Sequence, residues 1–223
     1  KMSSKLGIYS QAAGGLPPFS FGNALRFDGI DDYVTFSPIT VNNTTISLWF
    51  SAATLDGSFF GNSLAANTVF RIVNSTTIRY YNGGAVADFT VSPISLSTWY
   101  NLIITRDGTN VRMYINNVES TSGAIAHPSL IFNQVGRYYS SASNLFNGVL
   151  DEIGIIQSVA TAQNRIDLYN GGLGADFTAV MGANDLNYHL NESGTDRTAI
   201  DSGGSVNNGT LINFPTSGMW IPH

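Results

Sequence analysis

Cysteine is absent from this 223-residue chain, and charged side chains make up only 11% of it. Without cysteine there are no disulfides, so the folded state must be stabilised by its hydrophobic core. Lysine does not occur after Lys5, the arginines are scattered, and the formal net charge is -5. The chain therefore has no basic face for phosphate groups, and we expect no nucleic-acid partner.

Long apolar runs are also missing. No stretch approaches the ~20 residues of a membrane span, and the N-terminus lacks the basic start and apolar stretch of a signal peptide. The sequence begins Lys1-Met2, which indicates processing or excision from a longer chain. Residues 1–22 are rich in Ser, Gly, Ala and Pro, so we predict an arm or linker there and a single domain over residues 23–223.

The residues that are abundant favour a turn-rich all-β protein. Hydrophobic residues make up 43% of the chain, and 23 glycines accompany many Asn, Ser and Thr residues. Short apolar runs between turn residues predict strands. These strands fall at 46–50, 59–62, 69–73, 77–81, 85–91, 99–115 (a hairpin), 130–135 and 145–156. A single helix is predicted over 161–169, capped by Thr161 and ended by Gly171-Gly172.

Residues 24–36 combine two apolar runs with a turn that carries three carboxylates, Asp28, Asp31 and Asp32. The pattern predicts a strand, a hairpin or corner, and a second strand. Carboxylates this close repel one another unless they accept hydrogen bonds from backbone N–H groups or share a cation such as calcium. Self-capped turn residues and a shared cation both remain open.

The stretch from Ala24 to Phe36 resembles the opening strand of laminin-G-like jelly-roll domains of the concanavalin A-like lectin and glucanase superfamily. Residues 99–117 are similar to the family's central hairpin, with Asn117 where Gly is usual, and residues 146–171 resemble its closing strand and short helix. The resemblance implies an all-β, two-sheet antiparallel jelly-roll sandwich with one short helix.

The C-terminal part resembles a segment that in this family normally precedes the opening strand. Residues 186–194 and 201–211 carry this resemblance. We predict a circular permutation in which residues 186–215 complete the sheet beside Phe27 and Val149. The alternative is a truncated second repeat, which would expose the apolar side chains of the segment at a cost in buried area.

The resemblance also implies a structural calcium ion, with Asp28 and Asp151 as the carried-over ligands. Glucanases on this fold use an acidic triplet on one strand, whereas adjacent Asp151 and Glu152 are expected on opposite faces with no second acid beside either. We therefore expect no catalysis. His127, His189 and His223 lack metal-ligand spacing and are predicted to be surface or turn residues.

Aromatic, amide and arginine side chains at two predicted strand ends form the predicted ligand-binding set, because rings stack on sugars and amides bind hydroxyl groups. This set is Tyr80, Tyr81, Asn82, Arg137, Tyr138 and Tyr139. Core or edge tyrosines are the alternative interpretation, since strand alternation buries one of each neighbouring pair.

We therefore predict a non-catalytic recognition or adhesion module that binds a glycan or a host-surface protein outside the cell. Similar modules are found in bacteriophage virions, so the first alternative is a structural or decoration protein of the virion surface in a homo-oligomeric assembly. The second alternative is a glycoside hydrolase. Fold analogy carries most of this prediction.

Overall fold

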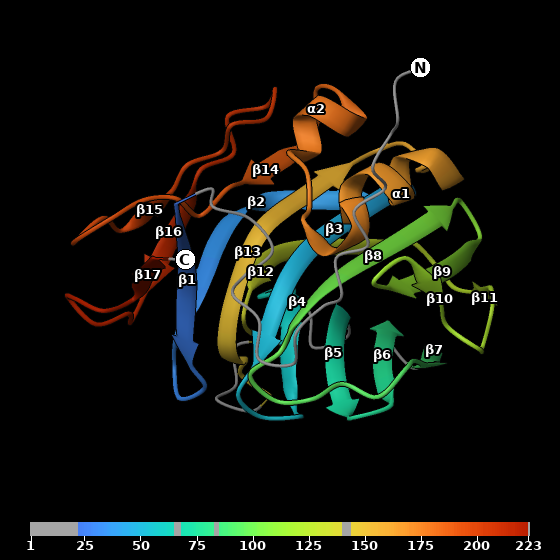
Figure 1. Ribbon diagram of the computed structural model, residues 1–223, viewed down its shortest axis with the longest axis horizontal. Coiled ribbons are helices and arrows are strands. Elements are labelled where there is room, and N and C mark those ends of the chain that lie inside the picture. Colours follow the sequence, from blue (N-terminus) through green and yellow to red (C-terminus); the bar gives the residue numbers. More distant parts are fainter. Residues whose placement is uncertain (1–21, 65–67, 83–84, 140–143, 223) are drawn as a thin grey trace, which may run out of the picture.

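In the computed structural model, two antiparallel sheets pack face to face (Figure 1). The structure describes residues 22–64, 68–82, 85–139 and 144–222, so the predicted arm lies outside the described residues apart from Gly22. The first sheet runs in the order β10 (Val118–Glu119), β9 (Asn110–Ile115), β8 (Trp99–Asp107), β3 (Asn43–Ala52), β13 (Asn147–Ile156), β1 (Asn23–Asp28) and β17 (Trp220–Pro222). Two further strands join it at the sides, β11 (Ile125–Ala126) on β9 and β14 (Leu186–Tyr188) on β13.

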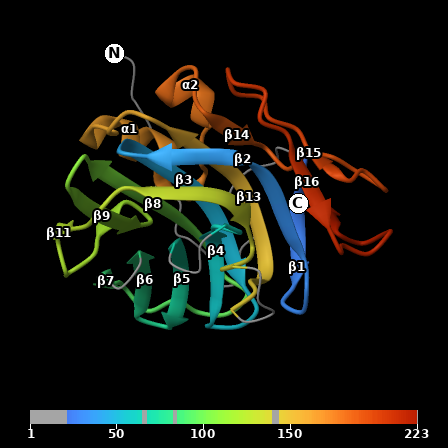
Figure 2. The same ribbon diagram turned by 180° about the vertical axis from the view of Figure 1, so that it is seen from behind.

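The second sheet lies behind the first, and the two views together show the sandwich (Figures 1 and 2). Its order is β15 (Thr198–Ala199), β16 (Gly209–Ile212), β2 (Tyr33–Val41), β12 (Leu130–Val135), β4 (Gly57–Gly61), β5 (Thr68–Asn74), β6 (Thr77–Asn82) and β7 (Ala85–Thr90). The predicted all-β, two-sheet antiparallel sandwich is confirmed.

Aromatic rings from both sheets interlock in the core. The centroids of Phe50 and Phe59 lie 4.9 Å apart, and those of Phe27 and Phe146 lie 5.9 Å apart in an edge-on arrangement. Each fully buried ring contributes roughly 1.5–3 kcal/mol by leaving water, which is how a chain without disulfides stabilises its fold.

Two helices cover part of the outer face of the first sheet. Helix α1 (Ala162–Tyr169) begins after Thr161, which caps it as predicted by accepting from Asn164 N at 3.1 Å. Helix α2 (Phe177–Met181) was not predicted, and Asp176 caps it. The helices close a small second core with the sheet, made of Ile103, Tyr114, Ile156, Leu168 and Phe177. None of the helices in the described ranges has the length and hydrophobicity needed to cross a membrane.

The acidic turn after β1 is a corner between the sheets rather than a hairpin, because β1 belongs to the first sheet and β2 to the second. Asp28 Oδ1 accepts from the backbone N–H groups of Ile30 (2.7 Å) and Asp31 (3.2 Å). Asp32 Oδ2 accepts from Asp28 N at 3.0 Å, and Gly29 takes the positive φ of 74° that the corner requires. The carboxylates of Asp28 and Asp32 thus cap backbone N–H groups of the turn.

The C-terminal segment joins both sheets. Strand β14 pairs with the far end of β13, and β16 pairs with β2. The predicted place of residues 186–215 beside Phe27 is confirmed for Phe214, whose ring centre lies 5.1 Å from that of Phe27. The strand position beside β1 is instead taken by β17, outside the predicted range, with Leu25 opposite Trp220. The circular permutation itself stays a prediction.

Candidate functional site

The outer face of the second sheet carries an open hollow near its β7 edge. Alternation along β6 decides which side chains reach it, because successive residues of a strand point to opposite faces. Ile78 and Tyr80 belong to the core, so Arg79 and Tyr81 point outward. On β5 the same alternation buries Phe70 and turns Arg71 outward.

Tyr138 reaches this face from a different part of the chain. It lies in the loop after β12, and its carbonyl accepts from Asn62 N at 3.2 Å, which fastens the loop across the end of β4. A methyl group at Gly61 would overlap the carbonyl oxygens of Arg137 and Tyr138. Glycine at position 61 is therefore what allows the loop to lie directly on the strand and carry Tyr138 to the hollow.

The hollow has a volume of about 210 Å³ and is formed by aromatic, aliphatic and guanidinium groups. Its walls are Val69, Arg71, Arg79, Tyr81, Val86 and Tyr138. Strand register arranges them in two rows, one with Val69, Tyr81 and Val86 directly opposite one another and the next with Arg71 opposite Arg79. Burial raises the pKa of Tyr138, so its hydroxyl stays protonated as a donor.

Ion pairs hold the two arginines in place. Arg79 donates through Nε and Nη2 to the two carboxylate oxygens of Asp88, each at 2.7 Å, and these bonds lower the pKa of Asp88. Arg71 donates to Asn144 Oδ1 and lies 3.9 Å from Asp56 Oδ1. Fixed donors beside two phenol rings suit a polyhydroxylated ligand, whose faces stack on rings and whose hydroxyls accept hydrogen bonds.

Tyr80, predicted as a ligand contact, is a core residue. Its side chain is 1% exposed, and its ring stacks on Phe70 at 4.1 Å and contacts His127 at 4.0 Å. Alternation places it on the opposite face from Tyr81, so this prediction is wrong. His127 is buried as well, contrary to the expected surface or turn position, and burial lowers its pKa.

Three further predicted residues do not line the hollow. Asn82 donates to Ser129 O at 2.9 Å, and the Arg137 guanidinium lies 4.4 Å from the centre of the Tyr33 ring. Tyr139 is partly buried and also lies outside the hollow walls. Of the six predicted ligand-binding residues, the structure brings Tyr81 and Tyr138 together.

Asp28 and Asp151, predicted to share calcium, lie apart. Asp28 pairs with Asn147 across the β1–β13 ladder, so Asp151 is four residues further along β13, a separation of about 13 Å. The carboxylates that do meet are those of the corner, where ligand oxygens of Asp28, Asp31 and Asp32 lie within 4.8 Å of one another. Calcium binding there stays a prediction.

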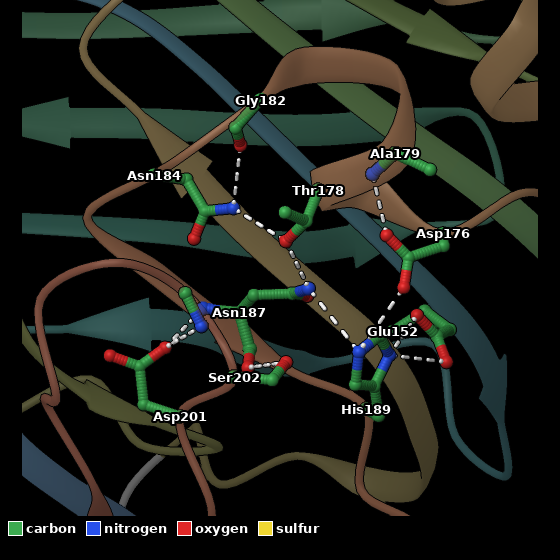
Figure 3. A network of polar contacts seen from close by, with 11 residues as sticks. Glu152, Asp176, Thr178, Ala179, Gly182, Asn184, Asn187, His189, Asp201 and Ser202 are labelled. Atoms are coloured by element: carbon green, nitrogen blue, oxygen red, sulfur yellow. Dashed lines mark hydrogen bonds and ion pairs between the residues drawn. The ribbon is translucent and has the colours of Figure 1, made fainter.

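A polar network beside the middle of β13 joins Glu152, Asp176, Asn187 and His189 (Figure 3). The strand register shifts between Asp151 and Gly154, and Glu152 takes a positive φ of 47°. This bulge interrupts the alternation on which opposite faces were predicted for Asp151 and Glu152. Glu152 instead meets His189, which we had predicted to be a lone surface or turn residue.

A family model described as the concanavalin A-like lectin/glucanases superfamily matches residues 28–164, more than half of the chain. The chain belongs to this superfamily. The match runs from the acidic corner to the start of α1. The resemblance to this superfamily that was predicted from sequence is therefore confirmed. The comparison with curated proteins found no match.

Solved structures show the same superfamily fold. A Bacteroides ovatus protein proposed to bind carbohydrate has a TM-score of 0.65 at 18% identity over 90% of this chain, which spans only 61% of that protein. Domain 4 of the extracellular arabinanase AbnA from Geobacillus stearothermophilus, solved with arabinotriose, scores 0.56 at 20% identity, covering 73% of this chain and 80% of that one. A pentraxin from Limulus polyphemus scores 0.54 at 12% identity, covering 66% and 82%.

Both arginines of the hollow are absent from the ligand-binding set predicted from sequence. Arg79 could have been found, because it lies two residues before Tyr81 on the same strand and therefore on the same face. Arg71 required the cross-strand register, which an irregularity between Ile72 and Asn74 shifts by one residue relative to the turn at residues 74–77. The pairing of Tyr138 with Tyr81 had no local signal, since the two residues meet only through the folded sheet.

Proposed function

We propose that this protein is a non-catalytic carbohydrate-recognition module and that the hollow on the outer face of the second sheet is its binding site. The observation that carries this proposal is the convergence of Tyr81 and Tyr138, from distant parts of the chain, beside the fixed guanidinium groups of Arg71 and Arg79. Two rings and two multidentate donors match the apolar faces and hydroxyl edges of a sugar.

The acidic residues support binding rather than hydrolysis. Asp151 and Glu152, the pair nearest to the acidic triplet of glucanases, are 1% and 4% exposed. Paired acids that cleave a glycosidic bond must flank that bond, which a polysaccharide cannot present to buried carboxylates. The glycans that such a site would bind are found outside cells, so we also propose an extracellular location or a place on a virion surface.

The binding test uses the whole chain on a glycan array, followed by isothermal titration with an oligosaccharide that scores, and with arabinotriose as a first soluble probe. Tyr81→Ala and Tyr138→Ala should each weaken binding roughly three- to tenfold, the effect of about 0.5–1.5 kcal/mol per aromatic contact. Tyr139→Ala is the matched control, because Tyr139 belongs to the same loop but lies outside the hollow.

Binding that survives both substitutions in folded protein would reject this hollow as the site. A blank array with intact protein would reject carbohydrate recognition and favour the structural role in an assembly, such as a virion component. Melting curves of each variant show whether it is folded.

A further inference from the structure

His189 lies between carboxylates from two different elements, away from the proposed binding site. Its Nδ1 is 2.8 Å from Glu152 Oε2 on β13, and its Nε2 is 3.3 Å from Asp176 Oδ2 at the start of α2 (Figure 3). The imidazole is partly exposed, with 27% of its side chain accessible, so it exchanges protons with solvent.

The geometry at His189 requires a charged ring. A neutral imidazole has one N–H donor and one acceptor nitrogen, whereas two carboxylates need two donors. Only the imidazolium can donate to Glu152 and Asp176 together. When the ring is neutral and keeps its bond to Glu152, Nε2 turns from donor to acceptor and its contact with Asp176 becomes repulsive.

A second partner for Nε2 is already in place. The side-chain nitrogen of Asn187 lies 3.4 Å from Nε2 and also donates to Thr178 Oγ1 at 2.9 Å (Figure 3). Asn187 is fully buried, and Asp201 and Ser202 hold its backbone, so its amide cannot move away. Nε2 therefore lies beside Asp176, which can accept from the charged ring, and beside Asn187, which can donate to the neutral ring.

We infer that His189 is a pH-dependent switch. When the ring is charged, it binds Asp176 and so links α2 to β13. When the ring is neutral, Nε2 releases Asp176 and accepts a hydrogen bond from Asn187. Glu152 holds the ring in both states. The moving part is the start of α2, where Asp176 Oδ1 caps the helix by accepting from Ala179 N at 2.6 Å.

The groups that face the ring set the direction of the switch. They are Glu152 and Asp151 on β13, Asp176 before α2 and Glu192 after β14. The hydrogen bond that His189 donates to Glu152 raises the pKa of His189 above its ordinary value of 6.5; burial opposes this rise, and the charges of Glu152, Asp176 and Asp151 add to it. The state in which charged His189 binds Asp176 is thus present at lower pH and is lost as the pH rises through this raised pKa.

The test is amide hydrogen exchange of the whole protein at about pH 6 and about pH 9, with exchange at each pH normalised to denatured protein. The reporters are the amides of Val180 and Gly182, which bond to Asp176 O and Thr178 O within α2. Their protection should fall roughly two- to fivefold at the higher pH, the range for a partly exposed ion pair.

Two variants separate this device from a general pH effect. His189→Gln cannot take a charge, and Asp176→Asn keeps a good helix cap but removes the charge, so each should give the same protection at both pH values. Asp167→Asn on α1 is the control and should behave as the wild type. A fall in protection that persists in Asp176→Asn, or no fall in the wild type, would overturn the inference.

Discussion

Gly61→Ala directly tests the close contact between the Tyr138 loop and β4. The added methyl group would lie closer than 3.0 Å to the carbonyl oxygens of Arg137 and Tyr138, a distance that Cβ atoms essentially never show. Both obstacles are backbone atoms, so no side chain can rotate out of the way. The loop must retreat from β4 by roughly 1 Å and lose its hydrogen bond from Asn62 N.

The expected cost combines these two effects. Forcing a methyl group into a packed contact costs about 1–3 kcal/mol, and the lost backbone hydrogen bond adds about 0.5–1.5 kcal/mol. For a chain of this size each kcal/mol lowers the melting temperature by roughly 2–4 °C, so we expect a fall of about 3–18 °C. Sugar binding should fall further than stability alone explains, because Tyr138 moves away from Tyr81.

Thermal unfolding followed by circular dichroism, with titration calorimetry on the glycan found in the array, measures both effects. Gly204→Ala is the control, since its methyl group would meet nothing closer than 3.5 Å. If Gly61→Ala melts and binds as the wild type does, the loop does not depend on this contact, and the account of how the hollow is built is wrong.

Three other outcomes follow from the corner and the C-terminal segment. Millimolar calcium should raise the melting temperature over a chelated sample, because the carboxylates at residues 28–32 share a small space; Asp32→Asn should remove the difference, and identical curves would reject a calcium site. In chelator, burial raises the pKa of Asp32 to about 6. The folded state then holds this proton more tightly than the unfolded state. The free energy of unfolding should therefore fall by at most about 3 kcal/mol as the pH rises from about 4 to 6. Urea titrations should show this fall in the wild type and a smaller one in Asp32→Asn. Deleting residues 186–223 should abolish cooperative melting, because β13 and β2 lose paired strands and the core loses buried apolar side chains; a truncated protein that melts like the full chain would contradict this.

Local patterns in the sequence determined the kind of elements and much of their position. Alternating apolar residues predicted the strands around Phe70 and Tyr80, and the capping residue Thr161 predicted the start of α1. These signals are readable because strand alternation and helix capping act over two to four residues. Alternation also indicated that one of Tyr80 and Tyr81 is buried, and the structure shows that it is Tyr80.

Tertiary structure alone decided which distant residues meet. Three contacts join segments far apart in the chain: the Tyr138 loop packs on Gly61, β17 pairs with β1, and Glu152 binds His189. Such contacts depend on the register and order of strands, which the whole core selects through buried area rather than any local preference. The composition of the chain therefore predicted a turn-rich all-β fold, while the packing of its two sheets placed the tyrosines, arginines and carboxylates that give it a candidate function.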